Sequence, residues 1–191
     1  MLENIISQIS DAMATMKTLD ATAIQNAAIM MADCFKNGNK ILLCGNGGSA
    51  ADCQHFAAEM VIRFRASVDR PGLPAIALTC DTSILTAGGN DIGFDNIFAQ
   101  QVSALGNKND ILIGISTSGN SQNILNAIEI AKEKGMKTIG LLGKDGGLIK
   151  KMCDTNVIVN HNTTARIQEA HILIEHIWCD IIERQLFPEQ F

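Results

Sequence analysis

The chain reads Ile41-Leu42-Leu43-Cys44, then Gly45-Asn46-Gly47-Gly48-Ser49, and continues into a segment that carries His55 and Glu59. The apolar run predicts a buried strand, and the glycine-rich turn leads from it directly into a helix. The first N–H groups of that helix are free to hold an anion, because the helix dipole is positive at this end. His55 and Glu59 share one helix face, since they are four residues apart. This stretch therefore predicts an anion cradle beside a candidate metal or acid/base pair.

Strand-like and helix-like segments alternate outward from this stretch to the end of the chain. Short apolar runs predict five strands at 40–44, 75–79, 110–115, 138–142 and 156–159. Helices are expected between them near 49–64, 81–87, 94–104, 121–134 and 147–151, and a last helix from about 164 to 186. The alternation predicts an α/β fold with a parallel sheet covered on both faces. Ligands in such folds lie at the carboxyl ends of the strands, where the glycine and serine loops fall here.

Two further helices are predicted ahead of the first strand. Apolar residues recur at helical spacing from Ile5 to Met16, and a second amphipathic segment begins after a cap at Asp20 or Thr22. We expect residues 1–38 to pack over the sheet or against a neighbouring subunit.

Composition places the chain among single-domain proteins. It has 191 residues, of which 47% are hydrophobic, and a net charge of -5, which argues against sequence-independent nucleic-acid binding. There is no signal-peptide pattern at the start and no apolar run long enough to span a bilayer. The six cysteines form no Cys-x-x-Cys motif. We therefore expect a cytoplasmic protein with reduced thiols and with no nucleic-acid or membrane partner.

A second anion loop is predicted at Ser116–Ser121, which follows the strand at 110–115 and contains four hydroxyl groups. Backbone N–H groups and hydroxyls at a helix N-terminus suit a phosphate. The alternative is that these residues only turn the chain and cap the helix. Gly45-x-Gly47-x-x-Ala50 satisfies a relaxed dinucleotide fingerprint, but Asp81 lies far beyond the usual spacing of the acidic partner, about 20 residues. The turn 143–147 is predicted to be a tight connection.

Candidate ligating and acid/base residues lie on two helices. His55 and Glu59 are arranged either to bind one cation or to form an ordinary surface pair. The last helix adds Gln168 and two histidines, and periodicity does not choose between His171 and His176. His161, in a polar loop, is expected to face solvent.

Several motifs together resemble the phosphoheptose isomerases, which are sugar-isomerase (SIS) domain enzymes. They are the segments 44–49, 54–59, 89–91, 114–121 and 166–169, followed by His176. The resemblance covers the whole chain. It implies one SIS domain over 1–191, a flavodoxin-like three-layer sandwich with a five-stranded parallel sheet behind two N-terminal helices. It also implies a homotetramer with active sites between subunits.

The resemblance also implies an activity and a site. The reaction would interconvert D-sedoheptulose 7-phosphate and D-glycero-D-manno-heptose 7-phosphate, the first step of ADP-heptose biosynthesis for lipopolysaccharide or capsule. Glu59 and His176 would be the acid/base pair, with one zinc per subunit on His55, Glu59, Gln168 and His176. The substrate would be lined by Asn46, Gly47, Gly48, Ser49, Arg63, Asn90, Asp91, Ser116, Thr117, Ser118, Ser121 and Gln168.

Two departures bear on this interpretation. Some members of the family carry Asp immediately before the Arg-Ile-Gln motif, where this chain has Ala165. The chain also resembles a non-catalytic SIS paralogue that associates with the bacterial replication initiator, which remains the alternative function. That paralogue lacks the glutamate and the second histidine of the pair. Because this sequence keeps Glu59 and His176, it favours the enzyme.

Overall fold

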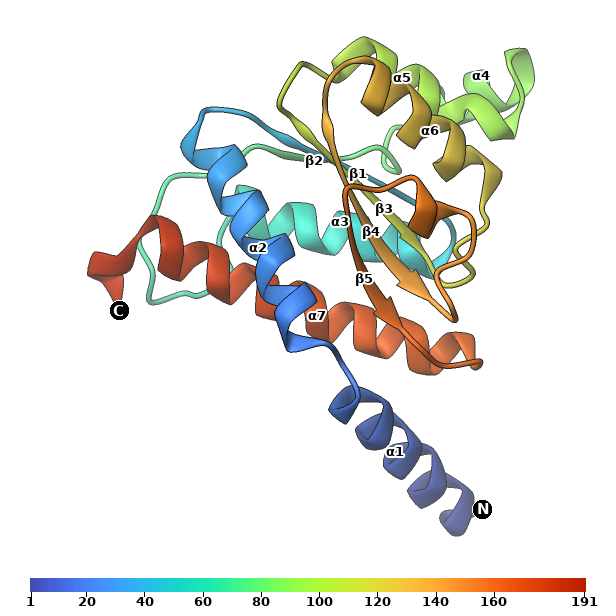
Figure 1. Cartoon of the computed structure of the whole chain (residues 1–191), viewed down its shortest axis with the longest axis vertical. Coiled ribbons are helices and arrows are strands. Elements are labelled where there is room, and N and C mark those ends of the chain that lie inside the picture. The colour runs from blue at the N-terminus through green and yellow to red at the C-terminus, as the bar shows by residue number, and fades with distance from the viewer.

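The computed structural model describes residues 1–191 and contains one five-stranded, all-parallel sheet (Figure 1). The strand order is β2-β1-β3-β4-β5. The strands are β1 (Ile41–Gly45), β2 (Ala75–Ala77), β3 (Ile111–Ser116), β4 (Lys137–Gly143) and β5 (Thr155–Val159). The predicted α/β class and all five strands are confirmed, and the strand boundaries differ by at most two residues.

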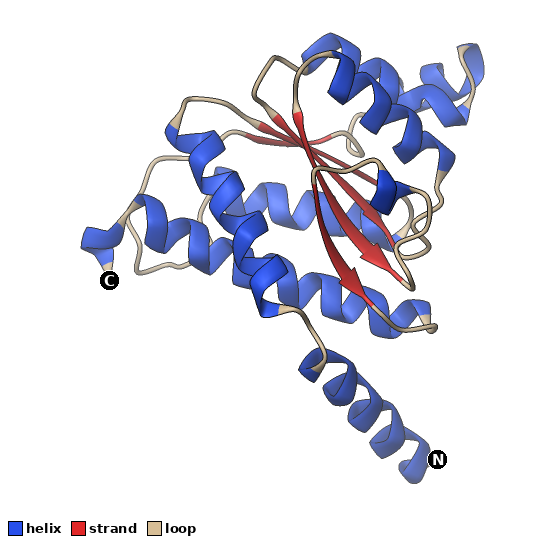
Figure 2. Ribbon diagram, viewed as in Figure 1, coloured by secondary structure: helices blue, strands red, loops and turns tan.

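Helices cover both faces of the sheet and make a three-layer sandwich (Figure 2). One face packs against α2 (Ala21–Lys36), α3 (Gly48–Val61) and α7 (Thr164–Leu186). The other packs against α5 (Ile97–Leu105), α6 (Gln122–Glu133) and the short 3-10 helix at Ile149–Lys151. Every residue of β1 and β3 is buried, which explains why these strands read as continuous apolar runs rather than as an alternating pattern.

The helix predictions differ from the structure mainly in the region after β2. The helix expected at 81–87 extends further, as α4 (Thr82–Asp91), and Asp81 caps it by accepting a hydrogen bond from the Ile84 N–H at 2.9 Å. The segment at 94–104 is divided into a 3-10 turn, Phe94–Asn96, and α5. After α7 the chain forms one more 3-10 turn, Pro188–Gln190.

The two N-terminal helices behave differently. Helix α2 is part of the sandwich, with seven buried residues against α7 and the sheet. Helix α1 (Leu2–Lys17) projects from the body and contacts α7 near the start of that helix (Figure 1). Its apolar face is largely exposed: the exposed fraction is 50% for Ile5 and 56% for Ile9. Packing of α1 against another subunit stays a prediction.

The sheet topology decides where a ligand can lie. The chain leaves β1 for β2 on one side and returns to β3 on the other, so β1 and β3 are neighbours at the point where the strand order reverses. Their register pairs Gly45 with Ile115, so both strands end at the same edge. The loops that follow them, 45–49 and 116–121, are therefore brought side by side.

Candidate functional site

The two loops meet at a small polar pocket at the carboxyl edge of the sheet. The pocket has a volume of about 110 Å³, and no hydrophobic residue lines it. Its lining residues come from both loops and from the start of α7, and they are Asn46, Gly48, Ser49, Thr117, Thr164 and Gln168. A pocket of this composition, next to two helix N-termini, suits an anionic group such as a phosphate.

Hydroxyl groups of the second loop cluster around Ser116, the residue before Thr117 of the pocket. Ser116 is buried, and its Oγ lies 3.2 Å from the Oγ of Ser121 and 3.4 Å from that of Ser118. Ser121 occupies the N-cap position of α6, yet its side chain makes no capping hydrogen bond. The alternative interpretation, in which this hydroxyl only caps the helix, is therefore not supported by the geometry. The Ser121 hydroxyl remains available to a ligand.

The tight turn at 143–147 packs against this loop. Gly119 adopts a φ of +67°, and a Cβ at this position would overlap the carbonyl oxygen of Gly146. Only glycine fits such a close approach with a left-handed backbone. The turn is thus the structural connection that the sequence predicts.

The glycine loop before α3 leaves space for the side chain of Gln168. Gly47 has a φ of +56°, and Gly48 begins the helix. A Cβ on Gly48 would lie 2.7 Å from the Gln168 Nε2 atom, so the absence of a side chain makes room for this amide. The Nε2 atom donates a hydrogen bond to the buried carboxylate of Asp52 at 3.0 Å.

The candidate acid/base residues come together where α3 crosses α7. The Nε2 atoms of His55 and His176 are 2.8 Å apart, and the His55 Nδ1 lies 3.8 Å from the Glu59 Oε1. Side chains of both partners are partly open to solvent, 37% for His55 and 23% for Glu59. The ring of Phe64 stacks on His176 with centroids 5.7 Å apart. The structure thus brings His176 to His55 and Glu59, from which it is separated by more than a hundred positions in the chain.

Structure also distinguishes the two histidines of α7. His171 is fully buried, and neither of its ring nitrogens has a hydrogen-bond partner. Burial lowers the pKa of His171 to about 4, which keeps the ring neutral. His176, not His171, faces His55. Two turns of the same helix thus carry a structural histidine and a site histidine.

The donor set fits a zinc ion in part. Two imidazoles and a carboxylate are typical zinc ligands, but the two Nε2 atoms, 2.8 Å apart, are at hydrogen-bond distance, whereas tetrahedral donors at 2.0–2.1 Å stand about 3.4 Å from one another. Gln168 does not join them in this chain, because its amide lies at the pocket and on Asp52, about 12 Å from His176 by helical rise. No group of three or more His, Cys, Asp or Glu side chains is close enough to hold an ion. One chain does not assemble the four predicted ligands.

Three further predicted substrate residues lie elsewhere in the chain. Arg63 is exposed in the turn that follows α3. Asn90 and Asp91 are exposed at the end of α4 and hydrogen-bond to each other at 2.7 Å. Helix α4 belongs to the layer on the other face of the sheet from α3 and α7 (Figure 1).

Several residues around the site were missed in the sequence. Asp52 and Glu175 are buried acids on the facing sides of α3 and α7, and burial raises the pKa of each carboxyl. An acid in an otherwise apolar helix stretch was the available signal for both. Thr164, at the start of α7, carried no such signal. His161 was expected to face solvent, but it is partly buried 3.4 Å from Asp11 of α1, because α1 passes beside its loop.

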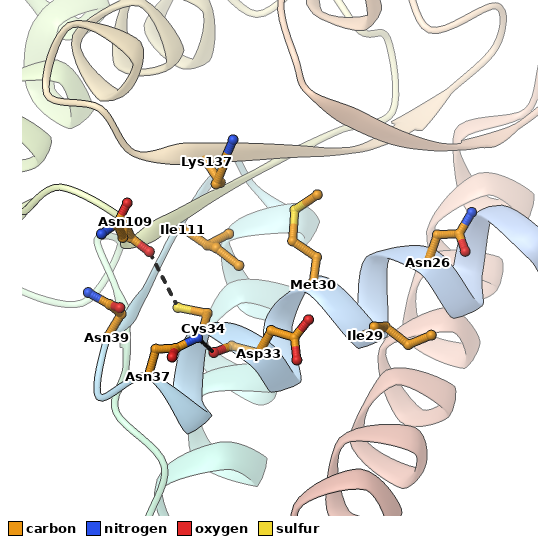
Figure 3. A pocket seen from close by; sticks show the side chains of 10 residues that line it. All are labelled: Asn26, Ile29, Met30, Asp33, Cys34, Asn37, Asn39, Asn109, Ile111 and Lys137. Carbon is orange, nitrogen blue, oxygen red and sulfur yellow. Dashed lines mark hydrogen bonds between the residues drawn. The ribbon is translucent and has the colours of Figure 1, made fainter.

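The largest pocket of the chain lies at the opposite edge of the sheet. It has a volume of about 600 Å³ and is lined by the second half of α2 and the starts of β3 and β4 (Figure 3). Asparagine side chains surround it, together with Asp33 and Lys137. Burial raises the pKa of its one thiol, Cys34, to about 12, so this cysteine is not a nucleophile. No hydrogen bond or ion pair joins Asp33 to Lys137, and we do not assign the site to this pocket.

Comparisons with known proteins agree with the observed fold. A model of the SIS domain matches residues 5–143. The chain is 58% identical over 163 residues to the phosphoheptose isomerase of Aliarcobacter butzleri, with 85% of each chain covered. It is 54% identical to that of Trichlorobacter lovleyi, with 96% of this chain and 94% of the relative covered. A solved phosphoheptose isomerase from Neisseria gonorrhoeae superposes with a TM-score of 0.87 at 47% identity and covers 95% of this chain and 98% of its own.

No helix of the structure is long and apolar enough to cross a bilayer.

Proposed function

The chain belongs to the phosphoheptose isomerase family of SIS-domain proteins and is a phosphosugar isomerase, and on this premise we propose that it interconverts D-sedoheptulose 7-phosphate and D-glycero-D-manno-heptose 7-phosphate. The observation that carries the proposal is the meeting of His176 with His55 and Glu59, beside a pocket lined by hydroxyl and amide groups. We also propose that the product supplies ADP-heptose synthesis for lipopolysaccharide or capsule in the cytoplasm.

The reaction moves one proton between C1 and C2 of the sugar through an enediol. One group removes the carbon-bound proton, and another gives a proton to the neighbouring oxygen and later takes it back. A carboxylate and an imidazole suit these two tasks, and we assign them jointly to Glu59 and His176. Both side chains are partly exposed, so a substrate can reach them.

The phosphate is assigned to the pocket between the two loops. Thr117 of the second loop and the N-terminal residues of α3 line this pocket, and the hydroxyls of Ser116, Ser118 and Ser121 cluster in the same loop as Thr117. Gln168 lines that pocket, and His176 lies two turns further along α7, about 12 Å by helical rise. An extended heptose phosphate is of comparable length. Binding energy at the phosphate would thus hold the reacting carbons at the acid/base pair.

We propose one zinc ion per subunit, with His55, Glu59, His176 and Gln168 as its ligands. Within one chain no three acidic or imidazole side chains are close enough to hold the ion, so binding would require these side chains to move together. Nitrogen and oxygen donors of this kind suit zinc. When bound, the ion would act as a Lewis acid on the sugar oxygens that gain negative charge. Gln168 is the fourth ligand of this proposal, and its distance from His176 within one chain favours a contribution from a second subunit.

A homotetramer with active sites between subunits is part of the proposal. Helix α1 exposes an apolar stripe, consisting of Leu2, Ile5, Ile6, Ile9 and Met13. Helix α4 has no buried residue and carries Asn90 and Asp91 away from the acid/base pair. Large exposed apolar faces are typical of protein interfaces. Association through these helices would cover the stripe and bring the residues of α4 to a neighbouring site.

The proposal is tested by incubating the purified protein with sedoheptulose 7-phosphate and following the sugar by NMR. We expect the aldoheptose 7-phosphate to form, at a rate that falls when a chelator removes zinc and recovers when zinc is restored. No conversion in zinc-loaded protein would contradict the proposed activity. It would favour a non-catalytic SIS protein, and binding to a replication initiator would then be the measurement to make.

A further inference from the structure

A buried ion pair lies behind the acid/base residues. The Nε of Arg70 and the Oε1 of Glu183 are 2.8 Å apart, and both side chains are fully buried. Arg70 comes from the segment between α3 and β2, and Glu183 comes from the last turn but one of α7. Two charges removed from water are costly unless additional hydrogen bonds satisfy them. The partners of this pair are therefore informative.

Arg70 holds the end of α3 at the residue that carries the candidate carboxylate. Its Nη2 donates to the carbonyl oxygen of Glu59 at 2.7 Å, and its Nη1 donates to that of Met60 at 2.8 Å. The last carbonyls of a helix have no partner within the helix. The planar fork of a guanidinium can reach two of them at once, which an ammonium group cannot do in the same geometry. Arg70 thus fixes the backbone of Glu59 itself.

Glu183 holds the aromatic ring that contacts the candidate imidazole. Its Oε1 accepts a hydrogen bond from the Phe64 N–H at 3.2 Å, as well as the one from Arg70. The Phe64 ring in turn stacks on His176, with an angle of 30° between the ring planes. Glu183 lies seven residues after His176, on the same face of α7. The ion pair is therefore connected to both members of the acid/base pair. Arg70 binds the backbone of Glu59, and Glu183 binds Phe64, whose ring contacts His176.

We propose that Arg70 and Glu183 are positioning residues for the isomerisation, which set where Glu59 lies relative to His176. This inference rests on the proposed function. Neither side chain touches the candidate phosphate pocket, which is lined by other residues. Proton transfer depends on the placement of donor and acceptor to within an ångström, whereas phosphate binding at a separate pocket does not depend on this ion pair. The two effects can be separated by kinetics.

The test compares Arg70→Lys, Arg70→Met and Glu183→Gln with a control pair elsewhere in the fold. Lys40 and Asp110 form a partly buried ion pair at the amino edge of the sheet, so Asp110→Asn perturbs a similar interaction far from the site. For each variant, kcat and KM for sedoheptulose 7-phosphate and the melting temperature are measured. The ring-proton shifts of His176 are recorded by NMR, because the Phe64 ring current acts on them.

We expect Arg70→Lys and Glu183→Gln to lower kcat about 100-fold and to leave KM nearly unchanged. Arg70→Met should lower kcat further, because it also removes the charge. The His176 ring-proton signals should move in these variants and stay in place in Asp110→Asn, which keeps its kcat even where its melting temperature falls. Folded Arg70 and Glu183 variants with wild-type kcat and unmoved His176 signals would overturn the inference. An inactive wild type would contradict the proposed function instead, while the His176 signals would still decide this inference.

Discussion

Replacing Gly48 by Ala tests whether Gln168 takes part in the site. A Cβ at this position would stand 2.7 Å from the Nε2 and 2.9 Å from the Cδ of Gln168, distances that real side chains do not tolerate. Gly48 has no left-handed backbone and begins α3, so alanine introduces no backbone strain. The substitution therefore acts almost entirely by displacing the Gln168 amide.

The effect on stability is small because two terms oppose each other. Displacing Gln168 breaks its hydrogen bond to the buried Asp52, which costs about 1–3 kcal/mol. Alanine is a better helix former than glycine by up to about 1 kcal/mol. The net loss is about 1 kcal/mol, which corresponds to about 2–4 °C in melting temperature for a domain of this size. The loss in kcat/KM should be about 100-fold, because the pocket loses both its shape and its amide.

A matched control comes from a glycine far from the pocket. Gly135 has a φ of +73° in the turn before β4, and a Cβ there would meet only the flexible side chain of Lys108, at 3.3 Å. Gly135→Ala should therefore cost about 1 kcal/mol of stability through backbone strain. Both variants are compared by thermal melting and by steady-state kinetics. A kcat/KM for Gly48→Ala equal to that of the control would show that Gln168 takes no part in the site.

Three other predictions concern separate parts of the chain. Ser121→Ala should raise KM about tenfold and lower the melting temperature by only a few degrees, because its hydroxyl contacts that of Ser116 but does not cap α6; equal KM values would remove Ser121 from the phosphate site. Replacing Ile5 and Ile9 by Lys should shift the protein to a smaller species in light scattering coupled to size exclusion, and an unchanged mass would exclude α1 from the interface. The pKa of His171 is lowered to about 4 in the folded chain, so its contribution to stability is present above pH 6.5 and is lost as pH falls from about 6.5 to about 4, by about 3 kcal/mol. In urea titrations at a series of pH values, the free energy of unfolding should fall less steeply with acidification for His171→Leu than for the wild type. Equal slopes for the two proteins would contradict this assignment.

Much of the fold could be predicted because its signals are local. The strands around Leu43 and Ile113 are buried on both faces and form unbroken apolar runs, and the loops after them contain the glycines and hydroxyls that such positions require. Their adjacency follows from the parallel register of β1 and β3. The pocket between these loops was thus within reach of sequence reasoning.

Other features depend on contacts that periodicity does not contain. His171 and His176 have similar sequence surroundings, and only the crossing of α3 over α7 shows which of them meets His55. Arg70 reads as an ordinary charge in a loop, whereas it is buried against the end of α3. The resemblance to a family supplied Asn90 and Asp91, and the structure places them on α4, on the other face of the sheet from α3 and α7.

The most direct test of the account is the turnover of sedoheptulose 7-phosphate in D₂O by wild-type protein and by Glu59→Gln, each loaded with zinc. Glutamine keeps the shape of the side chain and removes its capacity to take a proton. We expect the wild type to form aldoheptose 7-phosphate, and we expect the variant, folded and still binding the sugar phosphate, to be slower by a factor of about 10²–10⁴. Turnover by Glu59→Gln near the wild-type rate would show that Glu59 and His176 do not carry the proton transfer as a pair.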